Sequence, residues 1–154
     1  VMSSALDSFI SSTFWTEAIG PTAALSTLNR MKALRSWETI PVIGRQVKNI
    51  WLSSSAKHDL PIEVQGIDGI PTFNFLHKDP LILKTLFVES MLSFGFLAST
   101  QFYPTVCHDS DDLSQYSHAI DQVFSYISDL VNSSQDLASQ CKGDIATPSF
   151  QRLN

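Results

Sequence analysis

Hydroxyl side chains gather just before a predicted helix near the start of the sequence. Ser12 and Thr13 are followed by Trp15, and a Gly20-Pro21 step comes shortly afterwards. Hydroxyls and the unpaired N–H groups at a helix start are donors that suit a phosphate group. Hydroxyls in this place also cap helices without binding anything. From the residue types alone, capping is the preferred interpretation and phosphate binding is the alternative.

An acidic cluster forms the second place where chemistry is conceivable. It consists of His108, Asp109, Asp111 and Asp112. These residue types ligate metal ions, and a small metal hydrolase would use such a site. The cluster, however, stands where a long helix is predicted to begin. There Asp109 or Ser110 would cap the free N–H groups, and the carboxylates would face the positive end of the helix dipole. Capping is therefore preferred over metal binding.

The remaining reactive residues are isolated in the sequence. We expect His58, His77 and His118 to be ordinary surface histidines. Cys107 is expected to be a half-buried structural thiol, because neighbours in an extended loop point to opposite sides and His108 would face away from it. The sequence holds no G-x-S-x-G elbow, no G-x-G-x-x-G and no P-loop.

Composition narrows the class of protein. The 154 residues are 44% hydrophobic and carry a net charge of −5. Such a chain is long enough to bury a core, and its acidity argues against nucleic acid or an anionic membrane surface as a partner. Two cysteines are too few for a disulfide framework, and no apolar run is long enough to span a bilayer. We therefore expect a cytoplasmic protein.

The hydrophobic spacing predicts the elements that must position these residues. Gly20-Pro21 begins a first helix, and Thr39 caps a second one with Pro41 in its first turn. Residues 62–75 alternate apolar and polar side chains around a glycine-containing turn, which predicts two paired strands. A third helix begins near Pro80 and is closed by Gly95.

The second half of the sequence adds a strand and the longest helix. Residues 96–99 are predicted to form a third strand. After the "HDSDDL" stretch, apolar residues recur at steps of three and four up to Val131, which predicts a long amphipathic helix. The order of elements indicates an α+β domain with a mainly antiparallel sheet whose one face is covered by helices.

Four stretches together resemble the C-terminal part of a class III, fold-type I pyridoxal-phosphate (PLP) aminotransferase. The similarity is greatest to the branch near glutamate-1-semialdehyde aminomutase. The stretches are "FISSTFWTEAIGPTAAL" (9–25), "SWETIPVIGRQVKNIW" (36–51), "KTLFVESMLSFGFLASTQFYPTVCHDSDDL" (84–113) and "FQRLN" (150–154). By this resemblance, residues 1–38 are the end of the large-domain region and residues 39–154 are the small C-terminal domain. The first residue, Val1, would then lie in the interior of a longer chain.

The resemblance also assigns a cofactor site. In such enzymes a threonine reaches across the dimer interface to the phosphate of the PLP in the neighbouring subunit. Thr13 matches that threonine, with Ser12 beside it. The resemblance thus implies PLP as cofactor, a homodimer, the N-terminal remainder of the same enzyme as a partner, and small amine and keto or aldehyde substrates. Trp15 would either form a wall of the site or fill the dimer interface, and the interface is the preferred interpretation.

Three positions depart from the pattern of the closest branch. Ala18 stands where an arginine is usual, and Tyr103 replaces an acidic residue, which weakens the case for aminomutase activity specifically. No arginine between Gly95 and Asp112 matches the one that many relatives use to hold a substrate carboxylate. An amino-sugar or another non-standard amine is therefore a conceivable substrate.

The catalytic lysine of the family has no counterpart in these residues. None of the six lysines stands in its sequence context: Lys32, Lys48, Lys57, Lys78, Lys84 and Lys142. Transamination requires that lysine, so this chain would be the inactive portion of an active parent enzyme. The alternative hypothesis is a catalytically inactive module that serves dimerisation or partner binding.

Overall fold

The computed structural model describes residues 17–133 and 135–147, so Ser12 and Thr13 lie outside the described residues. The contacts divide the chain into two units, Val1–Arg35 and Ser36–Asn154. In the first unit, α2 (Ile19–Leu34) begins one residue before Gly20, close to the predicted start. Arg35, in the left-handed conformation with φ of 48°, ends this helix. None of the residues of α2 is buried.

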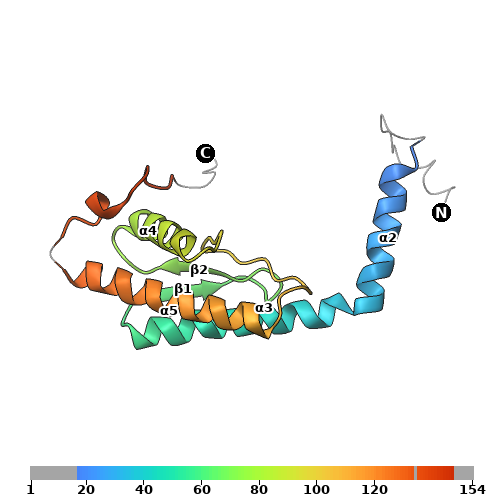
Figure 1. The fold of residues 1–154 in the computed structure, drawn as a ribbon, viewed down its shortest axis with the longest axis horizontal. Helices are drawn as coiled ribbons and strands as arrows, with labels where there is room; N and C mark the ends of the chain where they lie inside the picture. Colours follow the sequence, from blue (N-terminus) through green and yellow to red (C-terminus); the bar gives the residue numbers. More distant parts are fainter. Residues whose placement is uncertain (1–16, 134, 148–154) are drawn as a thin grey trace, which may run out of the picture. The chain divides into compact units, whose positions relative to one another are not determined.

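In its described residues the second unit contains three α-helices and two β-strands, which are labelled in Figure 1. The elements are α3 (Ser36–Lys57), β1 (Ile62–Gln65), β2 (Thr72–Phe75), α4 (Pro80–Ser93) and α5 (Ser110–Asn132), followed by the 3-10 turn η1 (Ala138–Gln140). The two strands pair antiparallel, and helices α3 and α4 contact them. Helix α5 packs against both α3 and α4. The predicted α+β class is confirmed.

The hairpin has one buried face, as the alternation predicts. Ile62 pairs with Phe75, and Val64 pairs with Phe73. The two phenylalanines are buried, and the two aliphatic partners pack against the same core. Successive strand residues point to opposite faces, so the intervening Glu63 remains exposed.

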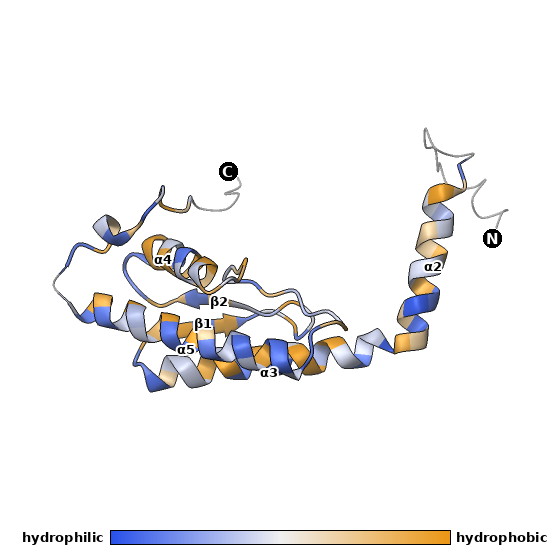
Figure 2. Cartoon of the chain, in the orientation of Figure 1, coloured by the Kyte–Doolittle hydropathy of each residue, from blue (hydrophilic) through white to orange (hydrophobic). Residues whose placement is uncertain are grey.

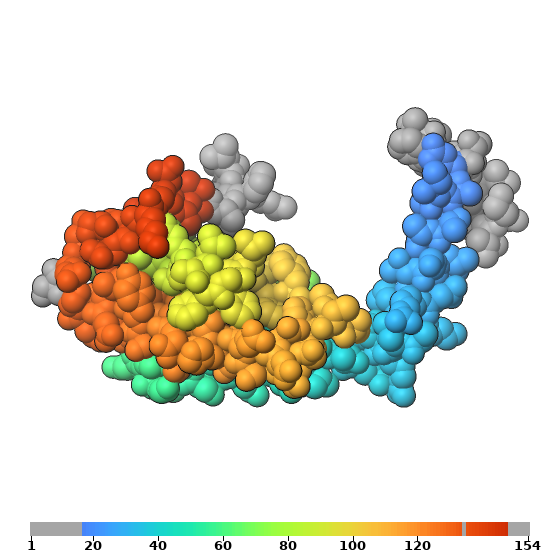
Figure 3. Space-filling model, viewed as in Figure 1, coloured from blue at the N-terminus to red at the C-terminus, as the bar shows by residue number. Residues whose placement is uncertain are grey.

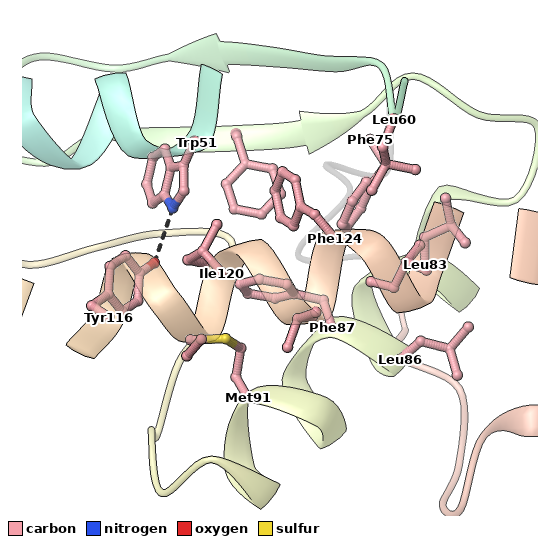
Figure 4. Packing of buried hydrophobic residues seen from close by; sticks show 14 of the residues in the cluster. Trp51, Leu60, Phe75, Leu83, Leu86, Phe87, Met91, Tyr116, Ile120 and Phe124 are labelled. Atoms are coloured by element: carbon pink, nitrogen blue, oxygen red, sulfur yellow. Dashed lines mark hydrogen bonds between the residues drawn. The ribbon is translucent and has the colours of Figure 1, made fainter. Parts of the chain in front are cut away.

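A cluster of aromatic rings forms the centre of the core (Figure 4). Phe73 lies 4.8 Å from Trp51, 5.3 Å from Phe87 and 5.9 Å from Phe124, measured between ring centroids. These distances are typical of tilted and edge-to-face pairs. The indole N–H of Trp51 donates a 2.9 Å hydrogen bond to the hydroxyl of Tyr116. The core therefore joins α3, β2, α4 and α5 into one body.

Two of the three helix caps predicted in this unit are confirmed. At the start of α5, the Asp109 carboxylate accepts the N–H groups of Asp111 and Asp112, and the Asp112 carboxylate accepts the N–H of Asp109. At the end of α4, Gly95 has a φ of 85° and donates its N–H to the Leu92 carbonyl. Glycine adopts this left-handed conformation without the steric cost that a side chain would bring.

The predicted start of the second helix is wrong. Helix α3 begins at Ser36 rather than at Thr39, and Pro41 lies inside it. Arg35 makes the break between α2 and α3 by itself, so the second helix can start one turn before the proline. Helices α3 and α5 each carry both hydrophobic and hydrophilic residues (Figure 2). The buried residues recur at helical spacing, so each helix buries one side.

The predicted strand at residues 96–99 does not form. The N–H of Phe96 closes α4 by donating to the Met91 carbonyl, and Leu97 is 96% exposed. Only further along does the chain meet the sheet, through an isolated bridge between Thr72 and Gln101. Within the described residues the sheet therefore has two strands, because the turn that closes α4 uses the N–H of Phe96.

Candidate functional site

A pocket of about 490 Å³ opens between the loop that follows α4 and the first turns of α5. We call it the loop pocket. It is lined by Phe96, Leu97, Ala98, Ser99, Gln101, Phe102, Tyr103, His108, Asp112, Leu113 and Tyr116. In Figure 3 the residues before α5, coloured gold, lie next to the start of that helix, coloured orange.

The loop reaches this position because it is tied to β2. The Phe73 N–H donates to the Thr100 carbonyl at 2.9 Å, and the Phe102 N–H donates to the Pro71 carbonyl at 3.0 Å. These two bonds flank the bridge at Gln101. They fix the backbone of the loop beside the sheet, so its side chains can face α5.

A continuous row of rings forms the wall of the loop pocket. Tyr116 lies 5.7 Å from Phe96 and 5.3 Å from Phe102, and Phe102 lies 5.1 Å from His108, between ring centroids. Tyr116 is buried, and its hydroxyl accepts the Trp51 N–H. Burial raises the pKa of Tyr116 well above its usual value, so this hydroxyl stays protonated. The wall is mainly apolar, and Tyr116 ties it to the core.

One ring nitrogen of His108 is hydrogen-bonded within the loop before α5. Its Nδ1 accepts the Thr105 N–H at 3.0 Å. A neutral imidazole with an acceptor at Nδ1 carries its hydrogen on Nε2, which is then a donor. Asp112, in the first turn of α5, lines the same pocket, and one oxygen of its carboxylate accepts the Asp109 N–H of the helix cap.

The acidic cluster at the start of α5 acts as a helix cap. In the capping box, the carboxylates of Asp109 and Asp112 accept backbone N–H groups at the helix start. In the preceding turn, the Thr105 N–H donates to His108 Nδ1. Within residues 17–133 and 135–147, no group of three or more histidine, cysteine, aspartate or glutamate side chains has a geometry that could hold a metal ion. The preferred interpretation of these residues as a cap is confirmed.

Two expectations about isolated residues are wrong. Cys107 is exposed rather than half-buried, because it lies in the turn before α5 and outside the core. His58 is not an ordinary surface histidine, because its side chain is only 15% exposed and its Nε2 lies 2.8 Å from an Asp121 oxygen. His77 and His118 remain partly or fully exposed.

The His58 contact belongs to a polar cluster that joins α3 to α5. Lys57 also binds Asp121 at 2.8 Å, and Ser128 donates to the His58 carbonyl at 2.6 Å. Hydrogen bonds from Lys57 and His58 lower the pKa of Asp121. The partners lie more than 60 residues apart in the sequence, so no local pattern indicates the cluster.

A second polar cluster fixes the β1–β2 turn on α3. Asp68 binds Lys48 and Arg45, each at 2.9 Å, and these hydrogen bonds lower the pKa of Asp68. Lys48 also donates to the Gly66 carbonyl at 2.8 Å. Both charged clusters hold structural elements together, and neither lines the loop pocket.

The fold is shared with part of a solved protein that binds PLP. That protein is the FumI protein of Sphingopyxis sp. MTA144, solved in its PLP internal aldimine form. The match has a TM-score of 0.71 and 23% sequence identity, and it covers 85% of this chain and 32% of that chain. This chain therefore spans about a third of the length of FumI. At this identity the likeness shows the fold.

The sequence matches no family model and no curated protein. In the part of the chain that the structure describes, no helix is long and apolar enough to cross a membrane.

Proposed function

We propose that this chain is the C-terminal part of a PLP-dependent enzyme that transfers an amino group between an amine and a carbonyl compound. The observation that carries the proposal is the likeness to FumI, which extends over 85% of this chain. The sequence resemblance to class III aminotransferases supports the same conclusion. The parent enzyme would be an aminotransferase or aminomutase of fold type I.

The loop pocket does not fit PLP. A phosphate calls for backbone or cationic donors. The described residues that line the loop pocket include no lysine or arginine. They include one carboxylate residue, Asp112. On the strength of the family resemblance we assign the PLP phosphate to Ser12 and Thr13, which lie outside the described residues. We assign no reaction step to the loop pocket.

In this proposal the chain supports the cofactor and does not perform the chemistry. PLP, when bound, acts as the electron sink for reactions at the amine carbon. The Thr13 hydroxyl would donate a hydrogen bond to the phosphate held by the other subunit of a homodimer, beside Ser12. The lysine that binds PLP covalently would lie in the N-terminal remainder of the same enzyme.

The test is PLP titration of the protein encoded by the full reading frame. Thr13→Ala should weaken PLP binding by about tenfold or more, because a hydrogen bond to a charged group is lost. Thr16→Ala, which removes a hydroxyl three residues away, is the matched control and should bind PLP normally. Equal affinities for the two variants would refute the role of Thr13, and no PLP binding by the unmodified protein would refute the proposal.

A second function is favoured by one observation on α2. Leu25 and Leu28 are each 61% exposed, and no residue of this helix is buried. Exposed apolar residues along one helix are typical of an interface. A catalytically inactive module for dimerisation or partner binding would use them directly. An upstream start codon close to Val1 would favour this second function, whereas a frame that continues into a lysine-bearing domain would favour the enzyme.

A further inference from the structure

The loop pocket is not used by the proposed phosphate contact, yet it has the features of a small-molecule site. Its volume of about 490 Å³ lies in the range of ligand pockets in proteins. Its wall consists of Phe96, Phe102 and Tyr116, with ring centroids 5.3 to 5.7 Å apart. Because Tyr116 is anchored to Trp51, this wall is present before any ligand arrives. A flat or ring-sized apolar group would therefore pack on it.

The charge at the pocket is negative. Asp112 lines it, and Asp109 and Asp111 lie in the same cap. The start of a helix carries about half a positive charge, which three carboxylates more than offset. No lysine or arginine is among the described lining residues. The field therefore attracts a cation and repels a carboxylate.

The polar groups at the pocket complement an uncharged or cationic molecule. Ser99 and Gln101 lie on the loop side and offer both donors and acceptors. His108 also lines the pocket, and because its Nδ1 accepts the Thr105 N–H, the neutral ring carries its hydrogen on Nε2. None of these groups provides the paired cationic donors that hold a carboxylate.

We propose that the loop pocket binds a primary amine carried on an apolar, ring-sized body that has no carboxylate. Binding of such an amine follows from the geometry of the loop pocket alone. That the bound amine belongs to the substrate class of the parent enzyme rests on the proposed function.

Three ring compounds of equal size test the proposal on the full 154-residue chain. Benzylamine, benzyl alcohol and benzoate differ in charge but not in body. We expect benzylamine to bind about three- to fivefold more tightly than benzyl alcohol, as for an exposed ion pair, and benzoate to bind most weakly. Chemical-shift changes in NMR should map to Ala98 and Leu113. Equal binding of benzoate and benzylamine, or shift changes confined to other residues, would overturn the proposal.

A matched pair of variants isolates the carboxylate in the pocket. Asp112→Asn keeps the oxygen that accepts the Asp109 N–H, so the cap can form, but removes the charge. It should bring the benzylamine preference over benzyl alcohol close to one. Asp111→Asn removes one negative charge from the neighbouring residue, whose side chain does not line the pocket. It should keep most of the preference, and equal effects of the two variants would contradict the assignment of Asp112.

A third variant tests the aromatic wall, and the full-length protein separates this inference from the proposed function. Phe102→Leu should weaken the binding of all three ring compounds by about two- to tenfold, because the ring contacts are lost.

If the chain binds benzylamine as described but the full-length protein binds no PLP, the proposed function fails and the pocket stands. If PLP binds but the ring compounds do not bind at the loop, the pocket assignment fails and the function stands.

Discussion

Gly44 on α3 provides the sharpest structural prediction, because the β1–β2 turn packs directly on its Cα. A Cβ added at Gly44 would overlap the carbonyl oxygen of Asp68 and lie 2.8 Å from its carbonyl carbon. Both clashing atoms are backbone, so no rotamer change can relieve the overlap. Gly44→Ala must therefore push the turn away from α3, which also separates Asp68 from Lys48 and Arg45.

The size of the effect follows from two opposing terms. Alanine favours a helix interior over glycine by about 1 kcal/mol. Overpacking against a backbone costs about 3 kcal/mol, the upper end of the usual range. The net loss in the free energy of unfolding should be about 2 kcal/mol, a fall of about 6–8 °C in Tm for a chain of this size.

Urea unfolding followed by circular dichroism measures this loss, with Gly20→Ala as the matched control. Gly20 also lies in a helix, but nothing stands within 4 Å of a Cβ added there. Gly20→Ala should leave stability unchanged or slightly raised. If Gly44→Ala is as stable as the unmodified chain, the close packing of the turn on α3 is wrong.

Three further predictions concern the Trp51–Tyr116 hydrogen bond, the end of α4 and the two ion-paired aspartates. Tyr116→Phe leaves the buried Trp51 N–H without its acceptor and should cost about 1–3 kcal/mol in urea unfolding, whereas an unchanged midpoint would show that this bond contributes nothing. Gly95→Ala places a side chain at a φ of 85° and should cost about 1 kcal/mol by the same assay; a neutral result would contradict the glycine-closed end of α4. The pKa values of Asp68 and Asp121 lie below the ordinary 3.8, so their stabilisation is present above that pH and is lost as the pH falls through the lower folded-state values. Stability measured from about pH 6 to about pH 3 should therefore fall, and Asp121→Asn should make the fall shallower.

Local signals predicted most of the elements. Alternation identified the hairpin around Phe73, and the three- and four-residue spacing identified α5 up to its Asp109 cap. The errors arose where one signal had two interpretations. Residues 96–99 are a short, mainly apolar run of the kind found in strands, but the turn at Gly95 uses the N–H of Phe96 to close α4. Pro41 indicated a helix start, although one turn of helix precedes it.

The candidate sites could be predicted only in part. The cap at Asp109 was predictable because its residues are neighbours in the sequence. The loop pocket was not, because its wall depends on Tyr116 and on the anchoring bond from Trp51, 65 residues earlier. The pairing of His58 with Asp121 is missed for the same reason. The predicted phosphate contacts, Ser12 and Thr13, lie outside the described residues and stay predictions.

The most direct test of the central claim is to locate the lysine that binds PLP in the protein encoded by the full reading frame. Borohydride reduction fixes bound PLP to its lysine, and peptide mass spectrometry then identifies the modified residue. We predict a single modified lysine in the sequence upstream of Val1 and none among the six lysines of this chain. Modification of one of those six, or no modification at all, would contradict the proposal that this chain is the C-terminal part of a PLP-dependent enzyme.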